Sequence, residues 1–311
     1  MSAYTVTSRS FVVSGLNVKI YCHPSQSVCE AFAPLPPVSV LFFLHGRGSS
    51  LAVVEPIIEK VVMIAHSDDK KRDLYVVGLD LRNHGRRLVN EQANMSWSEG
   101  NPNHALDMYG IQLGTQRDLS HLIDFLPSHL FPHGERTIEQ WGVAGISLGG
   151  HTAWLALAHE PRITFGIVIL GCADYLALMS RRAAESEFEL TPPTLPILPP
   201  SLVFLVRHVD PIYTPYTVND SRNPFLGKKI LVLRGAMDRI VPWTVMPVVL
   251  LRCRGYHKFY SHLPIFHVLA LFGSTLVLCL AAQRERIGGL TRDVTRKASE
   301  ITTWTRLARI A

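Results

Sequence analysis

Ser147 stands in a sequence pattern that could supply a nucleophile. Residues 145–150 read Gly-Ile-Ser-Leu-Gly-Gly, with a glycine two positions before and two positions after the serine. Where a strand turns sharply into a helix, such glycines permit a close approach that a Cβ atom would block, and the hydroxyl stands clear of the backbone. The pattern therefore indicates attack on a carbonyl by Ser147. The alternative is a plain turn whose serine caps the following helix.

The segments around this motif predict the elements that would hold it. Each of five apolar runs is hydrophobic throughout, as in strands buried on both faces of a parallel sheet. These runs are residues 38–44, 74–81, 141–146, 163–170 and 229–233. Residues 114–125 carry the apolar spacing of an amphipathic helix, and residues 9–22 predict an antiparallel hairpin at one edge. Alternating strands and helices predict an α/β fold with a mostly parallel, doubly wound sheet.

Four motifs carry a family resemblance. They read Phe-Phe-Leu-His-Gly-Arg-Gly at 42–48, Leu-Asp-Leu-Arg-Asn-His-Gly at 79–85, Gly-Ile-Ser-Leu-Gly-Gly-His at 145–151 and Leu-Arg-Gly-Ala-Met-Asp-Arg-Ile-Val-Pro at 233–242. With them the chain resembles the α/β-hydrolase superfamily, and within it looks like the intracellular serine hydrolases of filamentous fungi. The resemblance implies the α/β-hydrolase fold with a sheet of about eight strands. It also implies hydrolysis of a carboxylic ester or a related acyl bond through a Ser-His-Asp triad.

The resemblance further implies an oxyanion hole and an acid. The oxyanion hole is expected to consist of the backbone N–H groups of Arg47 and Leu148, which would be fixed before negative charge develops. The chain order Ser…Asp…His assigns the acid to Asp238, which follows the expected strand 229–233. Asp174, after the preceding strand, is the alternative acid.

The base is expected after Asp238, in a loop that follows a last strand. His267 is favoured because it lies 29 residues past Asp238, after an expected strand over 258–263. His262 and His257 are the alternative bases. The family normally has glycine before this histidine, and here Phe266 stands in that place. A catalytically impaired binding protein with the same fold is therefore an alternative function, as is an acyltransferase, thioesterase or peptidase that uses the same triad.

Other polar residues near these motifs are not expected to be catalytic. His84 is expected to be structural, in a turn where the family commonly has glycine at the position of Asn83. His104 and Asp107 are candidate rim residues without an assigned role. His151, one turn past Ser147, is expected to pack its helix against the sheet or to face the pocket.

The composition excludes several classes of protein. The chain has 311 residues, of which 47% are hydrophobic and 18% charged, as in a globular protein rather than a disordered or coiled-coil one. Its five cysteines and 14 histidines show no metal-ligand spacing, so we expect neither a metal nor another cofactor. No basic face interleaved with aromatic residues predicts nucleic-acid binding. We expect a small-molecule acyl substrate and a cytoplasmic location, since the cysteines favour a reducing compartment.

The chain divides by composition into a domain and a tail. Residues 1–282 predict an α/β-hydrolase domain, with an insertion over about 175–223 that has the place and size of a proline-rich lid. Residues 283–311 form a basic tail, with seven basic and three acidic side chains, and are a candidate for disorder. Residues 263–282 carry no charged side chain. A buried helix is the favoured interpretation of this stretch, and a membrane segment is the alternative.

Overall fold

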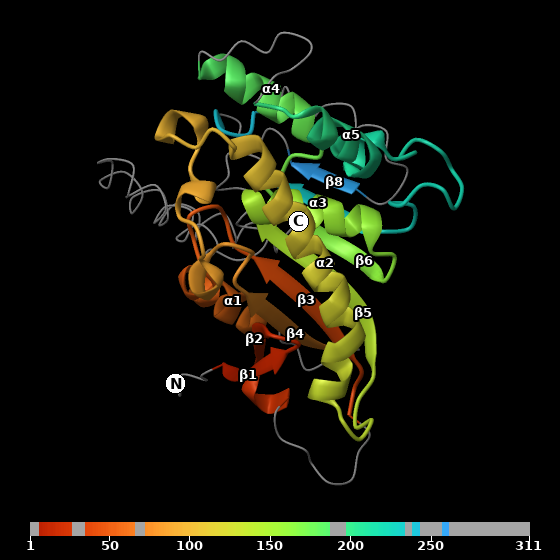
Figure 1. Ribbon diagram of the computed structural model, residues 1–311. Coiled ribbons are helices and arrows are strands. Elements are labelled where there is room, and N and C mark those ends of the chain that lie inside the picture. Colours follow the sequence, from red (N-terminus) through yellow and green to blue (C-terminus); the bar gives the residue numbers. More distant parts are fainter. Residues whose placement is uncertain are drawn as a thin grey trace, which may run out of the picture. The chain divides into compact units, whose positions relative to one another are not determined.

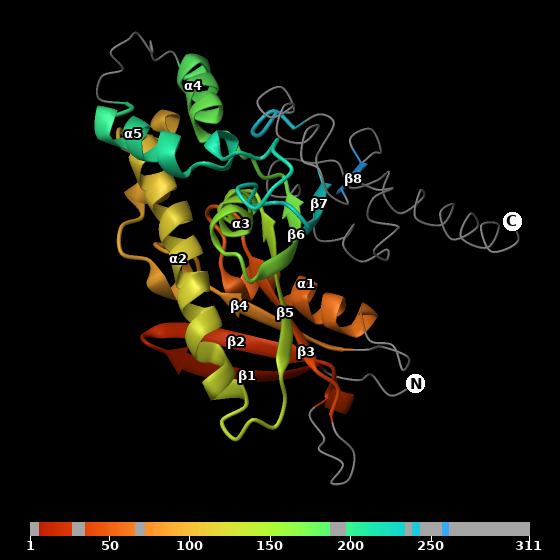
Figure 2. The ribbon, with the colours of Figure 1, turned by 90° about the vertical axis from the view of Figure 1, so that its right-hand side faces the viewer.

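A mostly parallel β-sheet with helices on both faces organises the part of the chain that the structure describes (Figures 1 and 2). The computed structural model describes residues 6–26, 35–65, 72–186, 197–233, 238–242 and 257–260, which all belong to the unit Met1–Ile265. The strands lie in the order β1-β2-β4-β3-β5-β6-β7-β8. Their bounds are β1 Thr7–Val13, β2 Leu16–Cys22, β3 Val38–Leu44, β4 Asp73–Leu79, β5 Ile138–Ile146, β6 Ile163–Ile169, β7 Lys229–Leu233 and β8 His257–Tyr260.

In the order of the sheet, the strands from β4 to β8 pair in parallel, and only the strands of the N-terminal hairpin pair in the antiparallel direction. β3 pairs in parallel with both β4 and β5, and parallel pairing continues through β6, β7 and β8. β1 and β2 form an antiparallel hairpin whose turn residues, Ser14 and Gly15, both have positive φ. A two-residue type I′ turn needs this backbone geometry. The predicted mostly parallel sheet and its antiparallel edge hairpin are confirmed.

Three long helices cover the sheet. α1 (Leu51–Ile64) lies on one face, and α2 (His104–Leu130) and α3 (Leu148–His159) lie on the other (Figure 2). α2 is more than twice as long as the predicted helix over 114–125. Its face toward the core includes Gln112, Thr115 and Gln116, which are buried although polar. These residues interrupt the apolar spacing, so the sequence pattern revealed only the middle of the helix.

Two further helices lie between β6 and β7 in the chain, near the carboxyl ends of the strands (Figure 1). They are α4 (Tyr175–Glu185) and α5 (Pro200–Val209). The hydroxyl of Tyr175 donates to the Ala105 carbonyl at the start of α2, and Asp210 accepts from the Tyr175 N–H at 2.7 Å. These contacts fix the start of α4 against the rest of the domain.

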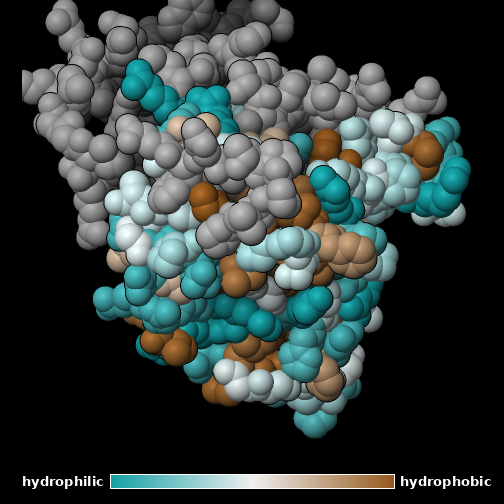
Figure 3. All heavy atoms as spheres, turned by 45° about the horizontal axis from the view of Figure 1, so that its top comes forward, coloured by the Kyte–Doolittle hydropathy of each residue, from teal (hydrophilic) through white to brown (hydrophobic). Residues whose placement is uncertain are grey.

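Short 3-10 helices complete the described structure, at Pro24–Gln26, Gly85–Arg87, Gln92–Asn94, Trp97–Glu99 and Pro211–Tyr213. On the face shown in Figure 3, hydrophobic and hydrophilic residues intermingle. None of the helices in the described ranges is both long and apolar enough to span a bilayer. The apolar stretch 263–282 and the basic tail 283–311 lie outside the described residues.

Candidate active site

Ser147 sits at the turn between β5 and α3 in a backbone conformation that few L-residues adopt. Its φ is 54° and its ψ is −112°. Ser147 is half-buried, whereas both its neighbours, Ile146 and Leu148, are buried. Although Ser147 occupies the N-cap position of α3, its side chain makes no capping hydrogen bond. The hydroxyl is therefore not consumed by the helix, and strain of this kind at a turn is a mark of functional sites.

The glycines around Ser147 are required by close backbone contacts. A Cβ atom on Gly145 would lie 2.1 Å from the Gly149 carbonyl oxygen, and one on Gly149 would lie 2.5 Å from the Leu44 carbonyl oxygen. A Cβ atom on Gly150 would lie 2.7 Å from the Ile169 carbonyl oxygen. Cβ atoms do not approach backbone this closely, so α3 can start here only because these positions are glycine.

The turn after β3 lies directly beside the serine. A Cβ atom on Gly46 would be 3.6 Å from the Ser147 Cβ, and the Gly149 N–H donates to the His45 carbonyl at 3.1 Å. Within the described ranges, the backbone N–H groups of Arg47 and Leu148 donate no hydrogen bond. Leu148 directly follows Ser147, and Arg47 lies in the turn beside it, so the structure places both predicted oxyanion residues in segments next to the serine.

A buried histidine holds the turn after β3. His45 is fully buried, and burial lowers its pKa to about 4, against a smaller opposing effect of its hydrogen bond to Gly46. The neutral ring contacts the Gly46 carbonyl through Nδ1 at 2.8 Å, and its Nε2 accepts from the Leu81 N–H at 3.1 Å. Nδ1 must therefore carry the proton. These two bonds connect the candidate oxyanion turn to the end of β4.

The segment that contains His84 supports this connection. The His84 ring lies 5.4 Å from the His45 ring, and its Nδ1 contacts the Arg82 carbonyl at 2.9 Å. Burial lowers the pKa of His84, so it too is neutral. Asn83 has a φ of 58°, a left-handed conformation that asparagine tolerates better than most residues do. The arrangement agrees with a structural role for His84.

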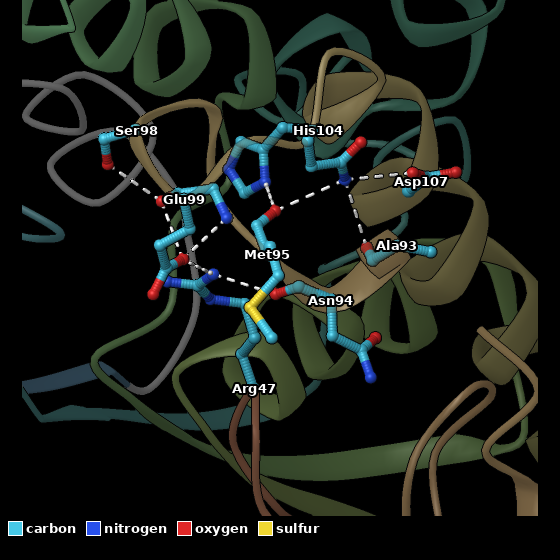
Figure 4. Close-up of polar contacts among 10 residues, drawn as sticks. Arg47, Ala93, Asn94, Met95, Ser98, Glu99, His104 and Asp107 are labelled. Carbon is cyan, nitrogen blue, oxygen red and sulfur yellow. Dashed lines mark hydrogen bonds and ion pairs between the residues drawn. The ribbon is translucent and has the colours of Figure 1, made fainter. Parts of the chain in front are cut away.

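The Arg47 side chain fastens the turn to the loop over 90–103 (Figure 4). Its Nη1 donates to the Asn94 carbonyl at 2.8 Å and to Glu99 Oε2 at 3.2 Å. Glu99 and Ser96 also form a capping box around the 3-10 helix Trp97–Glu99. Hydrogen bonds from Ser96 lower the pKa of Glu99 to about 2, with Arg47 contributing less. The sequence indicated only the N–H of Arg47 and missed the contacts of its side chain.

His104 and Asp107 hold the same loop from the start of α2 (Figure 4). His104 is 1% exposed, and its Nδ1 contacts the Met95 carbonyl at 2.7 Å. Asp107 accepts from the Asn101 amide at 3.0 Å. Burial lowers the pKa of His104 to about 4, so the ring is neutral at physiological pH. Their contacts are those of residues that order the loop.

The two candidate acids both follow strands at the carboxyl edge of the sheet, but their carboxylates differ. Oδ1 of Asp238, after β7, accepts from the N–H groups of Ile240 at 2.9 Å and Val241 at 3.0 Å. Its other oxygen has no hydrogen-bond partner in the part of the chain that the structure describes. Asp174, after β6, caps α4 by accepting from the Ala177 N–H, and burial raises its pKa.

Of the three candidate bases, only His257 lies within the described residues. His257 is the first residue of β8, where its backbone pairs with Ile230 near the start of the parallel strand β7. It therefore lies toward the amino end of the strands, whereas Ser147 follows the carboxyl end of β5. His262 and His267 lie outside the described residues. His151 instead accepts from the Cys172 N–H at 2.6 Å and so connects α3 to the segment after β6.

Within the described ranges, no group of three or more His, Cys, Asp or Glu side chains could hold a metal ion.

Known structures that are similar to this one identify the fold. TT1662 from Thermus thermophilus is 19% identical, with a TM-score of 0.55 over 88% of this chain and 98% of its own. The α/β-hydrolase fold is confirmed. Pyrococcus horikoshii acylaminoacyl peptidase is 12% identical with a TM-score of 0.55, and S-formylglutathione hydrolase from Agrobacterium tumefaciens is 13% identical with a TM-score of 0.51.

The coverage of these α/β-hydrolase-fold structures differs. The peptidase is matched over 95% of this chain but only 44% of its own, and the S-formylglutathione hydrolase over 90% and 96%. No protein-family model matches the chain. No curated protein matches it either. At these identities the comparisons establish the fold alone, and they give no support to the narrower likeness to fungal hydrolases.

Proposed function

We propose that the protein is a serine hydrolase that cleaves a carboxylic ester or a related acyl bond. The observation that carries the proposal is the conformation of Ser147. Its side chain is half-buried and makes no capping bond, and within the described ranges the backbone N–H groups of Leu148, the next residue, and of Arg47, in the adjacent turn, donate no hydrogen bond. A residue that served only to start α3 would not need a strained backbone or three tightly packed glycines.

The reaction proceeds through an acyl-enzyme in this proposal. Ser147 Oγ attacks the acyl carbonyl while the base accepts its proton, and the negative oxygen receives hydrogen bonds from the Arg47 and Leu148 N–H groups. The base then protonates the leaving group, and water cleaves the acyl-enzyme by the reverse sequence of proton transfers. Two fixed donors suit this step because losing one typically reduces the rate by roughly two to three orders of magnitude.

Asp238 is the proposed acid, because one of its carboxylate oxygens has no hydrogen-bond partner among the described residues. That oxygen could accept from a protonated imidazole and hold its orientation. Asp174 remains the alternative, although its carboxylate already caps α4. His267 is the proposed base and His262 the alternative. His257 is disfavoured, because its backbone lies toward the amino end of β8.

α4 and α5 are the proposed lid. They lie in the insertion between β6 and β7, near the carboxyl ends of the strands (Figure 1). The strand ends carry Ser147, Asp174 and Asp238, so helices in this position would restrict access to the serine. Ligands of open α/β sheets bind at this edge.

Hydrolysis of 4-nitrophenyl esters tests the proposal. We expect wild-type protein to release 4-nitrophenol, and Ser147→Ala to lose the activity while unfolding at the same denaturant concentration. His267→Gln, His262→Gln and His257→Gln, compared in parallel, identify the base as the variant with the largest loss of kcat. Two of the structural neighbours are described as a peptidase and an S-formylglutathione hydrolase, so acyl-peptide and thioester substrates belong in the same panel. Activity that Ser147→Ala retains would refute the mechanism.

A further inference from the structure

Arg182 is a half-buried cation at the carboxyl edge of the sheet. It lies two turns into α4, the helix that starts directly after β6. Its Nη2 donates to the Ile240 carbonyl at 3.4 Å, which is a long hydrogen bond. Ile240 belongs to the turn that the Asp238 carboxylate shapes after β7. The guanidinium therefore lies beside the loop of the proposed acid.

The described residues give Arg182 no carboxylate partner. Every other buried or half-buried arginine of the described ranges has one: Arg136 pairs with Asp73, Arg87 with Asp118 at 2.8 Å, and Arg72 with Glu139 at 2.6 Å. No carboxylate of the described ranges lies within 4.0 Å of the Arg182 guanidinium. Its neighbour in sequence, Arg181, is also half-buried and pairs with Glu185 at 2.8 Å. A guanidinium partly withdrawn from water loses hydration that such a partner would replace.

The charges around Arg182 do not replace that partner. Burial lowers the pKa of Arg182, and Tyr175, Cys172 and Asp238 offset this effect only in part. Arg47, in the turn after β3, lowers the pKa of Arg182 as well. The charge of Arg47 is itself balanced by Glu99 (Figure 4). Among the described residues, one positive charge is therefore left without an ion pair beside the turn that holds the proposed acid.

We propose that Arg182 binds a carboxylate of the substrate, so that the acyl compound cleaved at Ser147 carries a negative charge beside its scissile bond. This inference rests on the proposed function, because it names the substrate class of that site. A planar guanidinium matches a carboxylate with two parallel N–H···O bonds. A single carboxylate also fits the charge left over better than a phosphate dianion, since Arg47 is already paired.

A pair of esters of equal chain length tests the inference. The mono-4-nitrophenyl ester of adipic acid carries a carboxylate, and 4-nitrophenyl hexanoate is its neutral counterpart. We expect wild-type protein to prefer the adipate ester in kcat/KM. Arg182→Gln should reduce this preference roughly ten- to hundredfold, as expected for the loss of a charge-assisted hydrogen-bond pair, and Arg182→Lys should retain part of it. Arg181→Gln, one residue away at an arginine that already pairs with Glu185, should leave the preference unchanged.

Binding measured without turnover separates this inference from the proposed function. Adipate is titrated calorimetrically into Ser147→Ala and into the double variant Ser147→Ala with Arg182→Gln. Weaker binding by the double variant supports the anion site, even if wild-type protein hydrolyses neither ester, in which case the hydrolase proposal alone fails. If the wild-type protein hydrolyses both esters equally and Arg182→Gln leaves their ratio unchanged, the anion site is overturned and the hydrolase stands. Equal adipate binding by the two Ser147→Ala proteins overturns it as well.

Discussion

Replacing Gly145 by alanine tests whether close backbone packing positions Ser147. The new Cβ atom would lie 2.1 Å from the Gly149 carbonyl oxygen, 2.3 Å from the Gly149 carbonyl carbon and 2.8 Å from the Gly150 nitrogen. All three atoms are backbone atoms of α3, so no side chain can rotate away. Relief of the contact requires α3 to move by about 1 Å relative to β5, because ordinary contact begins near 3.4 Å.

This movement should affect both stability and reactivity. Overpacking by one methyl group costs roughly 1–3 kcal/mol of unfolding free energy, and a backbone contact places Gly145→Ala at the upper end of this range. A displacement of about 1 Å at a reacting group can reduce the rate by roughly 100-fold. Urea denaturation measures the first effect. The rate of covalent labelling by a fluorophosphonate, corrected for the folded fraction, measures the second.

Gly110→Ala is the matched control. Gly110 lies in α2, and outside the backbone of that helix no atom of the described residues lies within 4 Å of the position its Cβ atom would take. Alanine there should raise the unfolding free energy by up to about 1 kcal/mol and leave labelling unchanged. If Gly145→Ala unfolds and labels like the wild type, the close approach of α3 to β5 is not what positions Ser147.

Three other perturbations have outcomes that the contacts determine. Arg136→Met breaks a buried ion pair and should reduce the unfolding free energy by roughly 3–5 kcal/mol. Arg72→Met breaks an exposed ion pair and should reduce it by at most about 1 kcal/mol. Comparable losses for the two variants in urea denaturation would contradict the difference expected from burial. His45 and His104 have pKa values of about 4 when folded and near 6.5 when unfolded, so the unfolded chain binds more protons between these values. The contribution of these neutral histidines to the unfolding free energy should therefore be fully present above about pH 6.5 and should fall by roughly 2 kcal/mol per histidine by pH 5. His104→Gln should show a shallower pH dependence of the unfolding free energy in the same denaturation series. Glu99→Gln removes the ion pair of the Arg47 side chain and should slow fluorophosphonate labelling several-fold, while the unfolding free energy changes by no more than about 1 kcal/mol. An unchanged labelling rate would show that this contact does not hold the oxyanion turn.

The sheet could be predicted because its strands are buried on both faces. The apolar runs 38–44 and 229–233 coincide with β3 and β7, since a strand covered by helices needs no polar side. α2 was predicted only in part, because Gln112 and Thr115 face the core and break the apolar spacing. Buried polar residues depend on partners distant in the chain, which a local pattern does not reveal.

The same contrast applies to the site. The position of Ser147 follows from glycines within three residues of it, and local spacing therefore predicted the turn. The contact of Arg47 with Glu99 joins segments 52 residues apart, and the placement of Arg182 beside the turn of Ile240 spans 58 residues. Neither contact leaves a periodic trace in the sequence, so only the folded structure shows them.

The most direct test of the central claim is to label the folded protein with a fluorophosphonate and to locate the modification by mass spectrometry. We predict one modified peptide, with the phosphonyl group on Ser147, and no labelling of Ser147→Ala or of urea-unfolded wild-type protein. A wild-type protein that is folded by circular dichroism and remains unlabelled, or that is labelled at a different residue, would contradict the assignment of Ser147 as the nucleophile.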